Sequence, residues 1–529
     1  MFLNKLNLYY DTLKHVKPTQ LYHQVYYRIK IRVFESIYKQ IPAKVSLLNF
    51  SPGILFPNSW LGNHTFSFLN LEQDFKEIDW NYVSFGKLWT YNLNYFEFLN
   101  QVHISKEQGL ILIQDYISKK TVLKDGLEPY PISLRGINWI KFLTKEKIDN
   151  KEINEFLYSD YLRLTANLEY HLLANHLLEN GFSLLFGAYY FQDKNLYSKA
   201  KKILTVQLEE QILSDGGHYE LSPMYHQIIL HRVLDCLNLV QNNKWKADEL
   251  ESLLHNKAEI MLGWLEAITF KNGETPKVND STAVIAPNTK ELLTYAAELG
   301  LKSKTVQLKD SGYRKFEFKE LEILMDVGQI APKYQPGHSH ADSLQFLLNY
   351  KSKPVIVDTG ISTYEKNERR QLERSTSSHN TLSINDQNSS GVWGGFRVAR
   401  RAEVEILTDT SVEVLAKHNG YKNLGITHFR KFTLPNGNFR IEDIIESAAK
   451  NPYEAKGHLH FHPDTEIVIE GSSIIINKEL KIEISGVDQI ELVGYKLAEG
   501  FNKLKAAKKI EYTFKNKATL EFHAEAATK

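Results

Sequence analysis

The stretch Tyr334-Gln-Pro-Gly-His338-Ser-His340-Ala-Asp342-Ser-Leu-Gln-Phe346 places two histidines and an aspartate directly ahead of an apolar run. Pro336-Gly337 is typical of a turn, and the alternating apolar residues of 344–348 predict a strand. We therefore expect His338 and His340 to lie where a loop becomes a strand.

Two later stretches carry donors of the same kind. Lys353-Pro-Val-Ile-Val-Asp358-Thr-Gly360 is an apolar run that ends in a carboxylate, and Arg374-Ser-Thr-Ser-Ser-His379-Asn-Thr-Leu382 supplies a third imidazole. His340, Asp358 and His379 can converge as a metal site with an open position, and this donor set suits zinc better than calcium. Each residue alone is more often a hydrogen-bonding or turn residue. Only the combination indicates a site.

Composition narrows the function classes. A chain of 529 residues that is 43% hydrophobic can bury more than one core, so we expect at least two domains. Lys and Arg number 64 against 63 for Asp and Glu, so no general attraction to nucleic acid or membrane is expected, and a polyanionic substrate would need a local basic cleft. The single cysteine, Cys236, excludes an intramolecular disulfide and is expected to be a buried structural thiol.

The amino-terminal residues break their apolar run with Asn, Lys and Asp, so no signal-peptide core is expected. As written, the chain is expected to be cytoplasmic, or periplasmic or exported if the native start or export route differs. No window reaches the ~20 apolar residues of a membrane-spanning helix.

Periodicity predicts a helical domain over residues 1–305. Residues from about Tyr9 to Ile41 have helix-period apolar positions and predict an outer layer, and Phe66 and Phe68 predict a brief extended piece. Short connections favour antiparallel helical hairpins in a curve, ring or bundle. The further helices are expected at 133–142, 153–173, 176–191, 196–213, 225–242 and 249–268.

Residues 306–529 are expected to form an antiparallel β-sandwich. The alternating pattern starts at Arg314, and turn signals occur at Asn436-Gly437 and at Gly471. His458, His460 and His462 alternate on one strand face like a metal triad, but strand packing or hydrogen bonding is the better interpretation because Pro463 ends the run.

The helical half carries polar residues at helix ends. His176 and Glu179 lie three apart on one helix face, with Asn175 at the expected helix start. The stretch Asp215-Gly-Gly-His-Tyr-Glu-Leu-Ser-Pro-Met-Tyr-His226 ends one helix with glycines and starts the next near Ser222-Pro223. Each pattern is weak alone, but both can face the cleft that contains His338.

Aromatic and basic side chains are candidates for sugar contacts. Trp89, Tyr91 and Asn92 can line a groove, although core packing is the commoner role for such rings. Trp393 and Arg397 flank a Gly-rich loop and can stack on sugar and pair with a carboxylate.

Five motifs, taken together and in order, resemble the heparinase II/III-like polysaccharide lyases, especially forms found near bacterial surface-polysaccharide genes. They are Leu88-Trp-Thr-Tyr-Asn-Leu-Asn-Tyr-Phe, Ser133-Leu-Arg-Gly-Ile-Asn-Trp-Ile, Asn175-His-Leu, the 215–226 stretch and Gly337-His-Ser-His-Ala-Asp-Ser. The resemblance implies an incomplete α/α toroid followed by an antiparallel β-sandwich, with the substrate groove between them. It also implies elimination chemistry on uronic-acid polysaccharides.

The same resemblance assigns roles. Tyr225 corresponds to the catalytic tyrosine, His176 to the helical-domain histidine and His338 to the sheet-domain histidine, with Asn175 and Glu179 beside them. His340, Asp358 and His379 fall where related enzymes bind a structural zinc, whose role here would be to fix His338.

Elimination removes the C5 proton of a uronate and expels the O4-linked sugar. The carboxylate must first be hydrogen-bonded or protonated, which suits Asn175 with an imidazole or Glu179. Tyr225 can act as base or acid, and as a base it needs a lowered pKa, which a nearby imidazolium or Arg would provide. Two alternatives stay open: a glycan-binding or assembly protein without activity, and a hydrolase that uses the metal site.

Overall fold

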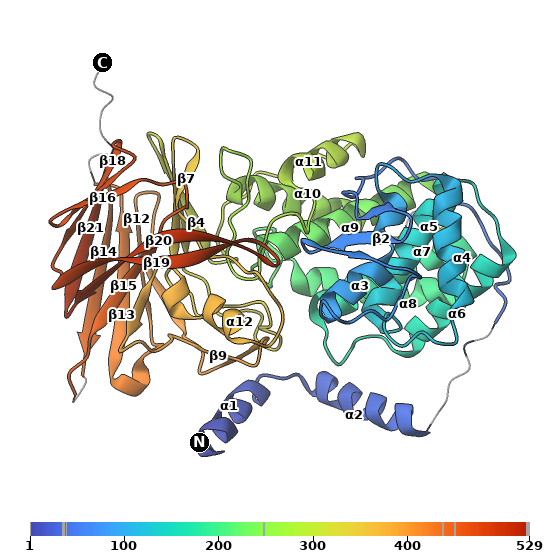
Figure 1. Cartoon of the computed structure of the whole chain (residues 1–529), viewed down its shortest axis with the longest axis horizontal. Coiled ribbons are helices and arrows are strands. Elements are labelled where there is room, and N and C mark those ends of the chain that lie inside the picture. Colours follow the sequence, from blue (N-terminus) through green and yellow to red (C-terminus); the bar gives the residue numbers. More distant parts are fainter. Residues whose placement is uncertain are drawn as a thin grey trace.

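The computed structural model describes residues 2–33, 38, 40–246, 249–435, 438–448 and 451–524. Helices fill one half of the molecule and antiparallel sheets the other (Figure 1). The longer helices are α1 Phe2–Leu13, α2 Pro18–Val33, α3 Lys87–Tyr95, α4 Lys106–Ser118, α5 Pro129–Lys145, α6 Lys151–Ala166, α7 Ala174–Phe191, α8 Lys194–Gln211, α9 Pro223–Asn242, α10 Glu251–Ile268 and α11 Thr289–Glu298, and a short helix, α12 Glu368–Glu373, lies in the sheet half.

Consecutive helices from α5 to α8, and α9 with α10, pack on each other as the short connections predicted. Helix α7 also contacts α5 and α9. The start of α9 also follows the sequence prediction, because Ser222 caps it by accepting the Tyr225 N–H and Pro223 occupies its first turn. Cys236 is buried in α9 as expected.

One predicted helix is shorter than expected. Helix α6 ends at Ala166, where residues 153–173 predicted a single helix, and the chain then turns before α7. The turn is stabilised by Asn180, whose Oδ1 accepts the Glu169 N–H and whose Nδ2 donates to the Glu169 carboxylate. Leu173 adopts φ 60°, outside helical geometry. The result is that Glu169 lies beside the first turn of α7.

The amino-terminal segment forms two helices, α1 and α2, that lie along the outside of the molecule (Figure 1). Residues 34–37 and 39 of the predicted helical pattern lie outside the described residues. Phe66 and Phe68 belong to β2 of a small sheet, as expected for an extended piece. Its strands are β1 Trp60–Gly62, β2 Thr65–Phe68 and β3 Leu71–Asp74.

The sheet half is a sandwich. One layer is an eight-stranded antiparallel sheet, in the order β11 Val404–Asp409, β12 Glu413–His418, β13 Ile426–Thr433, β14 Phe439–Ser447, β21 Lys517–Ala524, β18 Leu480–Ser485, β17 Ser473–Ile476 and β16 Ile467–Glu470. Gly471 lies in the β16–β17 turn, as predicted. The predicted Asn436-Gly437 turn lies outside the described residues, although the strands on either side of it, β13 and β14, pair.

Two four-stranded sheets form the opposite layer. Their orders are β4 Tyr313–Phe318, β5 Leu321–Asp326, β6 Phe346–Tyr350 and β7 Lys353–Ile356, and β19 Gln489–Gly500, β20 Lys503–Phe514, β15 Ala455–His460 and β8 Leu382–Ile384. A bridge between Ile356 and Phe461 joins the two. Side chains from both layers form one buried apolar core. His458 and His460 bond Ser383 and Asn380, in agreement with the strand-packing interpretation.

The two halves are held together by a buried junction. Trp264, Tyr313 and Leu347 belong to a shared apolar cluster that draws on both halves. The Asp215 carboxylate accepts the backbone N–H groups of Lys309 and Ser311, at 2.9 Å each, where the chain passes from α11 towards β4.

The long β19–β20 hairpin reaches from the sandwich to the helical half (Figure 1). At its tip, the carbonyl of Phe501 accepts from Asn70 Nδ2, and Asn502 Nδ2 donates to the Leu69 carbonyl. These bonds close one side of the space between the two halves.

Candidate active site

A cleft of about 660 Å³ lies between the helices and the sandwich. The helical wall comes from α3, α5, α7 and α9, and the sandwich contributes His338, Tyr364, Phe396 and Phe501. The cleft therefore opens where the predicted polar helix ends meet the predicted histidine loop.

Tyr225 and His338 form the centre of the site. Their rings lie 4.0 Å apart between centroids, and the Tyr225 hydroxyl lies 3.2 Å from the hydroxyl of Tyr364. Tyr225 comes from the first turn of α9 and His338 from the loop before β6. The two residues that were expected to act in catalysis from separate domains thus lie in contact in the cleft, with their rings tilted by 33°.

Asp280 fixes the orientation of His338. Its buried carboxylate accepts the His338 Nδ1–H at 2.8 Å and two bonds from the guanidinium of Arg370, at 2.5 and 2.6 Å. Burial alone would raise the pKa of Asp280, but Arg370, His338 and His340 hold it well below its usual range. Because an ionised Asp280 accepts at Nδ1, the Nε2 atom of His338 keeps its lone pair for the cleft.

Asn175 is tied to the same centre through Glu220. The Glu220 carboxylate accepts the backbone N–H of Asn175 at 3.1 Å and its Nδ2 at 3.0 Å, and it lies 3.6 Å from His338 Nε2. The Oδ1 atom of Asn175 is buried with no hydrogen-bond partner among the described residues. It is therefore available to accept a hydrogen bond from a ligand hydroxyl or carboxyl.

His176 lines the cleft with its ring against Tyr130, 4.8 Å between centroids. Its Nδ1–H donates to Glu169 at 3.0 Å, which is the contact made possible by the turn after α6. Burial opposes charge on this imidazole, but Glu169, Glu220 and Glu179 together raise its pKa. The geometry favours an imidazolium facing the cleft.

Glu179 does not line the cleft, contrary to the role expected for it. Its side chain is 1% exposed and accepts Arg232 Nε at 2.8 Å. Arg232 reaches the cleft instead, with Glu97 and Asp235 each 3.8 Å from its guanidinium nitrogens. Glu179 lies on the buried side of α7, where its charge must be neutralised.

Two of the three sugar-contact candidates on α3 are in the cleft. Tyr91 and Asn92 line it, but Trp89 is fully buried, and its Nε1–H donates to the Leu71 carbonyl. The sugar-binding prediction for Trp89 is wrong, because its helix face packs onto the small sheet, where Phe68 contacts its ring.

The structure does not bring Trp393 and Arg397 to the cleft, where they were expected to contact sugar. Both lie outside the cleft, and the Arg397 guanidinium covers the Trp393 ring at 4.7 Å while Trp393 packs edge-on against Tyr9 of α1. They belong to a hairpin of β9 Gly391–Trp393 and β10 Arg397–Ala399, and it is Phe396 in its turn that lines the cleft. Trp393 and Arg397 are cross-strand partners and so lie on one face of the hairpin, whereas Phe396 lies in the turn.

Tyr225 does not have the lowered pKa that a base role would need. Burial raises it well above its usual range, and Tyr364, Asp280 and Glu220 add to the effect. The nearby guanidinium of Arg370, which lies over the Tyr364 ring, is paired with the Asp280 carboxylate. Tyr225 is therefore a protonated phenol at neutral pH, suited to donating a proton.

His340 and His379 have unsatisfied nitrogens that suit a metal ion. Their rings lie 5.2 Å apart, and His340 Nδ1 and His379 Nε2 are both buried with no hydrogen-bond partner among the described residues. Each ring is anchored through its other nitrogen, His340 to Asp280 at 2.9 Å and His379 to Asp358 at 2.8 Å. This anchoring pattern is usual for histidine ligands.

Charge at this second centre also favours a cation. Burial lowers the pKa of His340 to about 4, which keeps it neutral and able to ligate. Burial opposes charge on His379 too, but the carboxylates of Asp358, Asp342 and Asp326 raise its pKa. His340 and His379 are thus suitable metal ligands. Asp358 uses one carboxylate oxygen to accept the hydrogen bond from His379.

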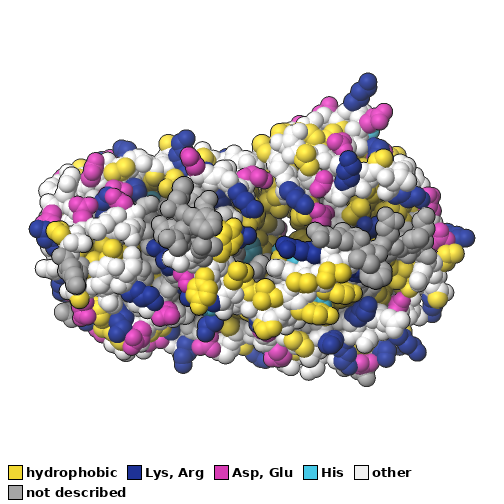
Figure 2. Space-filling view, turned by 90° about the horizontal axis from the view of Figure 1, so that it is seen from below, with side chains coloured by type: hydrophobic (Ala, Val, Ile, Leu, Met, Phe, Trp, Pro, Cys, Tyr) yellow, Lys and Arg dark blue, Asp and Glu magenta, His cyan; other side chains and the backbone are white. Residues whose placement is uncertain are grey.

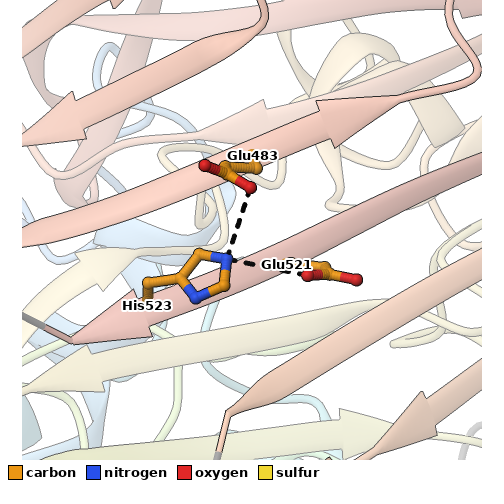
Figure 3. Close-up of side chains that lie close together, drawn as sticks. All are labelled: Glu483, Glu521 and His523. Carbon is orange, nitrogen blue, oxygen red and sulfur yellow. Dashed lines mark ion pairs between the residues drawn. The ribbon is translucent and has the colours of Figure 1, made fainter.

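Within the described part of the chain, one group of three residues has potential metal-ligand atoms within 4.8 Å of one another: Glu483, Glu521 and His523 (Figure 3). This group is different from the predicted set of His340, Asp358 and His379. This group lies on neighbouring strands β18 and β21 of the eight-stranded sheet. Lys481 pairs with Glu483 along β18, and Arg440 of β14 pairs with Glu521 of β21, so ion pairing on the sheet surface accounts for the group.

Three residues of the site were not singled out by sequence reasoning: Asp280, Tyr364 and Arg370. Asp280 lies in the polar run Val278-Asn-Asp-Ser-Thr282, a signal that could have been noticed. Glu220 was inside a quoted motif without a role. Tyr364 and Arg370 have no local signal, because only the fold brings them to the cleft.

Comparisons with known proteins identify the family. Residues 132–306 match the family description "Heparinase II/III N-terminus" and residues 301–522 match "Heparinase II/III-like, C-terminal". The heparin-sulfate lyase of Bacteroides stercoris is 24% identical over 345 residues, 58% of this chain and 49% of that protein. FtsZ-localized protein C of Caulobacter vibrioides is 24% identical over 312 residues, 53% and 52% of the two chains. The chain spans about half the length of these relatives.

Solved structures confirm the fold. The crystal structure of heparinase III superposes with a TM-score of 0.68 at 14% identity, covering 96% of this chain and 92% of that one. The heparan sulfate lyase HepC from Pedobacter heparinus gives a TM-score of 0.56 at 15% identity, covering 87% and 81%. The predicted incomplete α/α toroid followed by a β-sandwich is therefore correct.

The Asp280 network yields a prediction about stability. We expect Asp280→Asn to lower the free energy of unfolding by about 3 kcal/mol, because it leaves the buried Arg370 guanidinium without its charged partner. Urea denaturation followed by circular dichroism measures the loss. Asp409→Asn is the matched control, since Asp409 pairs with Arg314 at the surface with 35% of its side chain exposed, and about 1 kcal/mol or less is expected there. Equal losses in the two variants would contradict the role given to Asp280.

Proposed function

The chain belongs to the heparinase II/III-like family, and from that starting point we propose that it is a polysaccharide lyase that cleaves a uronic-acid-containing glycan by β-elimination. The observation that carries the proposal is the close contact of Tyr225 with His338 in the cleft, with Asn175 and His176 on the adjoining wall. These four residues supply an acid, a base and a site for the substrate carboxylate.

His338 is the base in this proposal. Its Nδ1–H is held by Asp280, so Nε2 can accept the C5 proton of the uronate. The electron pair of the C5–H bond forms the C4–C5 double bond as the C4–O4 bond breaks. The same carboxylate stabilises the imidazolium that results, as in other histidine–carboxylate pairs.

Tyr225 is the acid. Its raised pKa keeps the phenol protonated, and the hydroxyl can protonate O4 of the departing sugar. The neighbouring Tyr364 hydroxyl, 3.2 Å away, can donate to the phenolate oxygen that forms. Because Tyr225 and His338 lie side by side, with 4.0 Å between ring centroids, the proposal has proton removal and proton donation on the same side of the sugar ring.

His176 binds the uronate carboxylate, because its imidazolium offers positive charge at the cleft. The unpartnered Oδ1 atom of Asn175 accepts a hydrogen bond from a neighbouring sugar hydroxyl. Neutralising the carboxylate lowers the cost of the second negative charge that develops when the C5 proton leaves.

The charge of the cleft points to a weakly sulfated or unsulfated glycan. Among the described residues that line the cleft, the only Lys or Arg side chains are those of Lys87 and Arg232. Lys87 pairs with Glu128 at 2.7 Å, and Arg232 is surrounded by three carboxylates. Tyrosines line much of the rest and can stack on sugar rings. A polysulfated chain would find few free cations.

A divalent metal, zinc by its donor set, is part of the proposal. His340 and His379 would hold it, with Asp358 in support, and when bound it would fix the loop that carries His338.

The lyase proposal is tested by incubating the protein with uronate polymers and following absorbance of the unsaturated uronate. We expect Tyr225→Phe to lower kcat by about 100-fold or more, because one proton donor is lost while the ring is kept. Tyr158→Phe is the control, since this tyrosine bonds Asp193 away from the cleft. A saturated product would instead indicate a hydrolase, and binding without any product a glycan-binding protein.

The charge argument predicts discrimination by sulfation. An unsulfated glucuronate–N-acetylglucosamine polymer should have a kcat/KM at least about tenfold above that of the same backbone carrying sulfates. Glu365→Lys, which adds a cation at the cleft, should reduce the ratio of the two kcat/KM values. A preference for the sulfated polymer would contradict the charge argument while leaving the lyase assignment intact.

The metal proposal separates two neighbouring histidines. His340→Ala should lower Tm, metal content and activity, because lost ligand binding reduces folding free energy. His338→Ala should lower activity with metal content unchanged and Tm nearly so, since Asp280 keeps its bonds to Arg370. Elemental analysis measures the metal content and thermal melts measure Tm. Wild-type protein purified without bound metal would contradict the metal proposal.

A further inference from the structure

Helices α1 and α2 expose an unusually apolar surface. Eight large apolar side chains within 21 residues are each at least 44% exposed: Tyr9, Tyr10, Leu13, Leu21, Tyr22, Val25, Tyr26 and Ile29. The five on α2 follow the spacing i, i+1, i+4, i+5 and i+8, which is one continuous face of a helix. Such a stripe costs free energy in water unless something covers it.

The opposite side of α2 is bonded to the helical domain. Tyr27 donates its hydroxyl to the Leu168 carbonyl, and Gln20 Nε2 donates to the Leu172 carbonyl at 3.1 Å. His23 stacks on Tyr170 with 4.9 Å between ring centroids. The body of the protein therefore holds α2 with its apolar stripe turned outward.

Charge distinguishes this segment from the rest of the chain. Residues 1–33 contain six Lys and Arg residues against one Asp, whereas the whole chain has 64 against 63. Figure 2 looks at the molecule from the side on which α1 and α2 lie in Figure 1, and hydrophobic side chains gather there in a band with Lys and Arg nearby. Arg28 is among the exposed residues of α2.

We propose that α1 and α2 dock the protein onto an anionic lipid surface. An amphipathic helix with aromatic and aliphatic residues on one face and basic residues beside them lies in the interfacial layer of a membrane. Tyrosine is enriched at that depth because its ring is apolar and its hydroxyl stays hydrated. None of the helices among the described residues is long and apolar enough to cross the bilayer.

Docking would act on the cleft through one hairpin. Tyr9 of α1 packs against Trp393 of β9, and Thr12 accepts a hydrogen bond from the same indole. The turn of that hairpin carries Phe396, which lines the cleft. A lipid-bound α1 would thus support one wall of the site. The docking itself stands apart from the proposed lyase activity.

Vesicle co-sedimentation with the full chain tests the inference. We expect the protein to sediment with vesicles that contain phosphatidylglycerol, to bind pure phosphatidylcholine at least about tenfold more weakly, and to lose binding as salt rises from about 0.1 M to about 0.5 M. Val25→Glu with Ile29→Glu should reduce the anionic binding by at least about tenfold, because both side chains leave the lipid phase and add repelling charge.

The matched control is Ile111→Glu with Val206→Glu, at exposed apolar positions of α4 and α8 (64% and 54% exposed), which should bind like the wild type. Thermal melts check that both pairs fold. Equal loss in the control pair, equal binding to both lipids, or no binding at all would overturn the proposal. A dimer that the Val25 and Ile29 changes dissolve, without vesicle binding, would assign the stripe to a second copy instead.

Discussion

A single buried carboxylate, Asp280, holds the site together. Removing it from water would cost several kcal/mol, and the cost is offset because Arg370, His338 and His340 all donate to it. Asp280 precedes α11 on the helical side, whereas its three donors come from the sandwich side. The bonds that satisfy one charge therefore also set the position of the two domains at the cleft and the tautomer of His338.

His338 and His340 lie two residues apart and share this carboxylate, yet they face different surroundings. The free nitrogen of His338 faces the cleft, and that of His340 is buried beside His379. A turn before β6 allows this divergence. The bonds from His338 and His340 to Asp280 thus hold the loop before β6 in place. They limit the side-chain movement that would weaken a preorganised site.

The tyrosine pair illustrates how burial sets a chemical role. Tyr225 and Tyr364 are surrounded by carboxylates and rings, and their pKa values are raised. A base role for Tyr225 would require a nearby cation, but the adjacent guanidinium of Arg370 is already neutralised by Asp280. The environment makes the phenol a donor and leaves proton removal to the imidazole.

The sequence by itself determined the helical and sheet halves, the start of α9 at Ser222 and the loop that presents His338, because capping residues, turn residues and apolar periodicity act over a few neighbouring positions. It also placed Asn175, His176 and Tyr225 at helix ends. Only the tertiary structure decided that Trp89 packs into the core, that Trp393 and Arg397 contact α1, and that Glu179 supports Arg232. Asp280, Tyr364 and Arg370 reach the cleft from separate segments, so their contacts depend on how the two domains pack, a long-range property that no local pattern encodes.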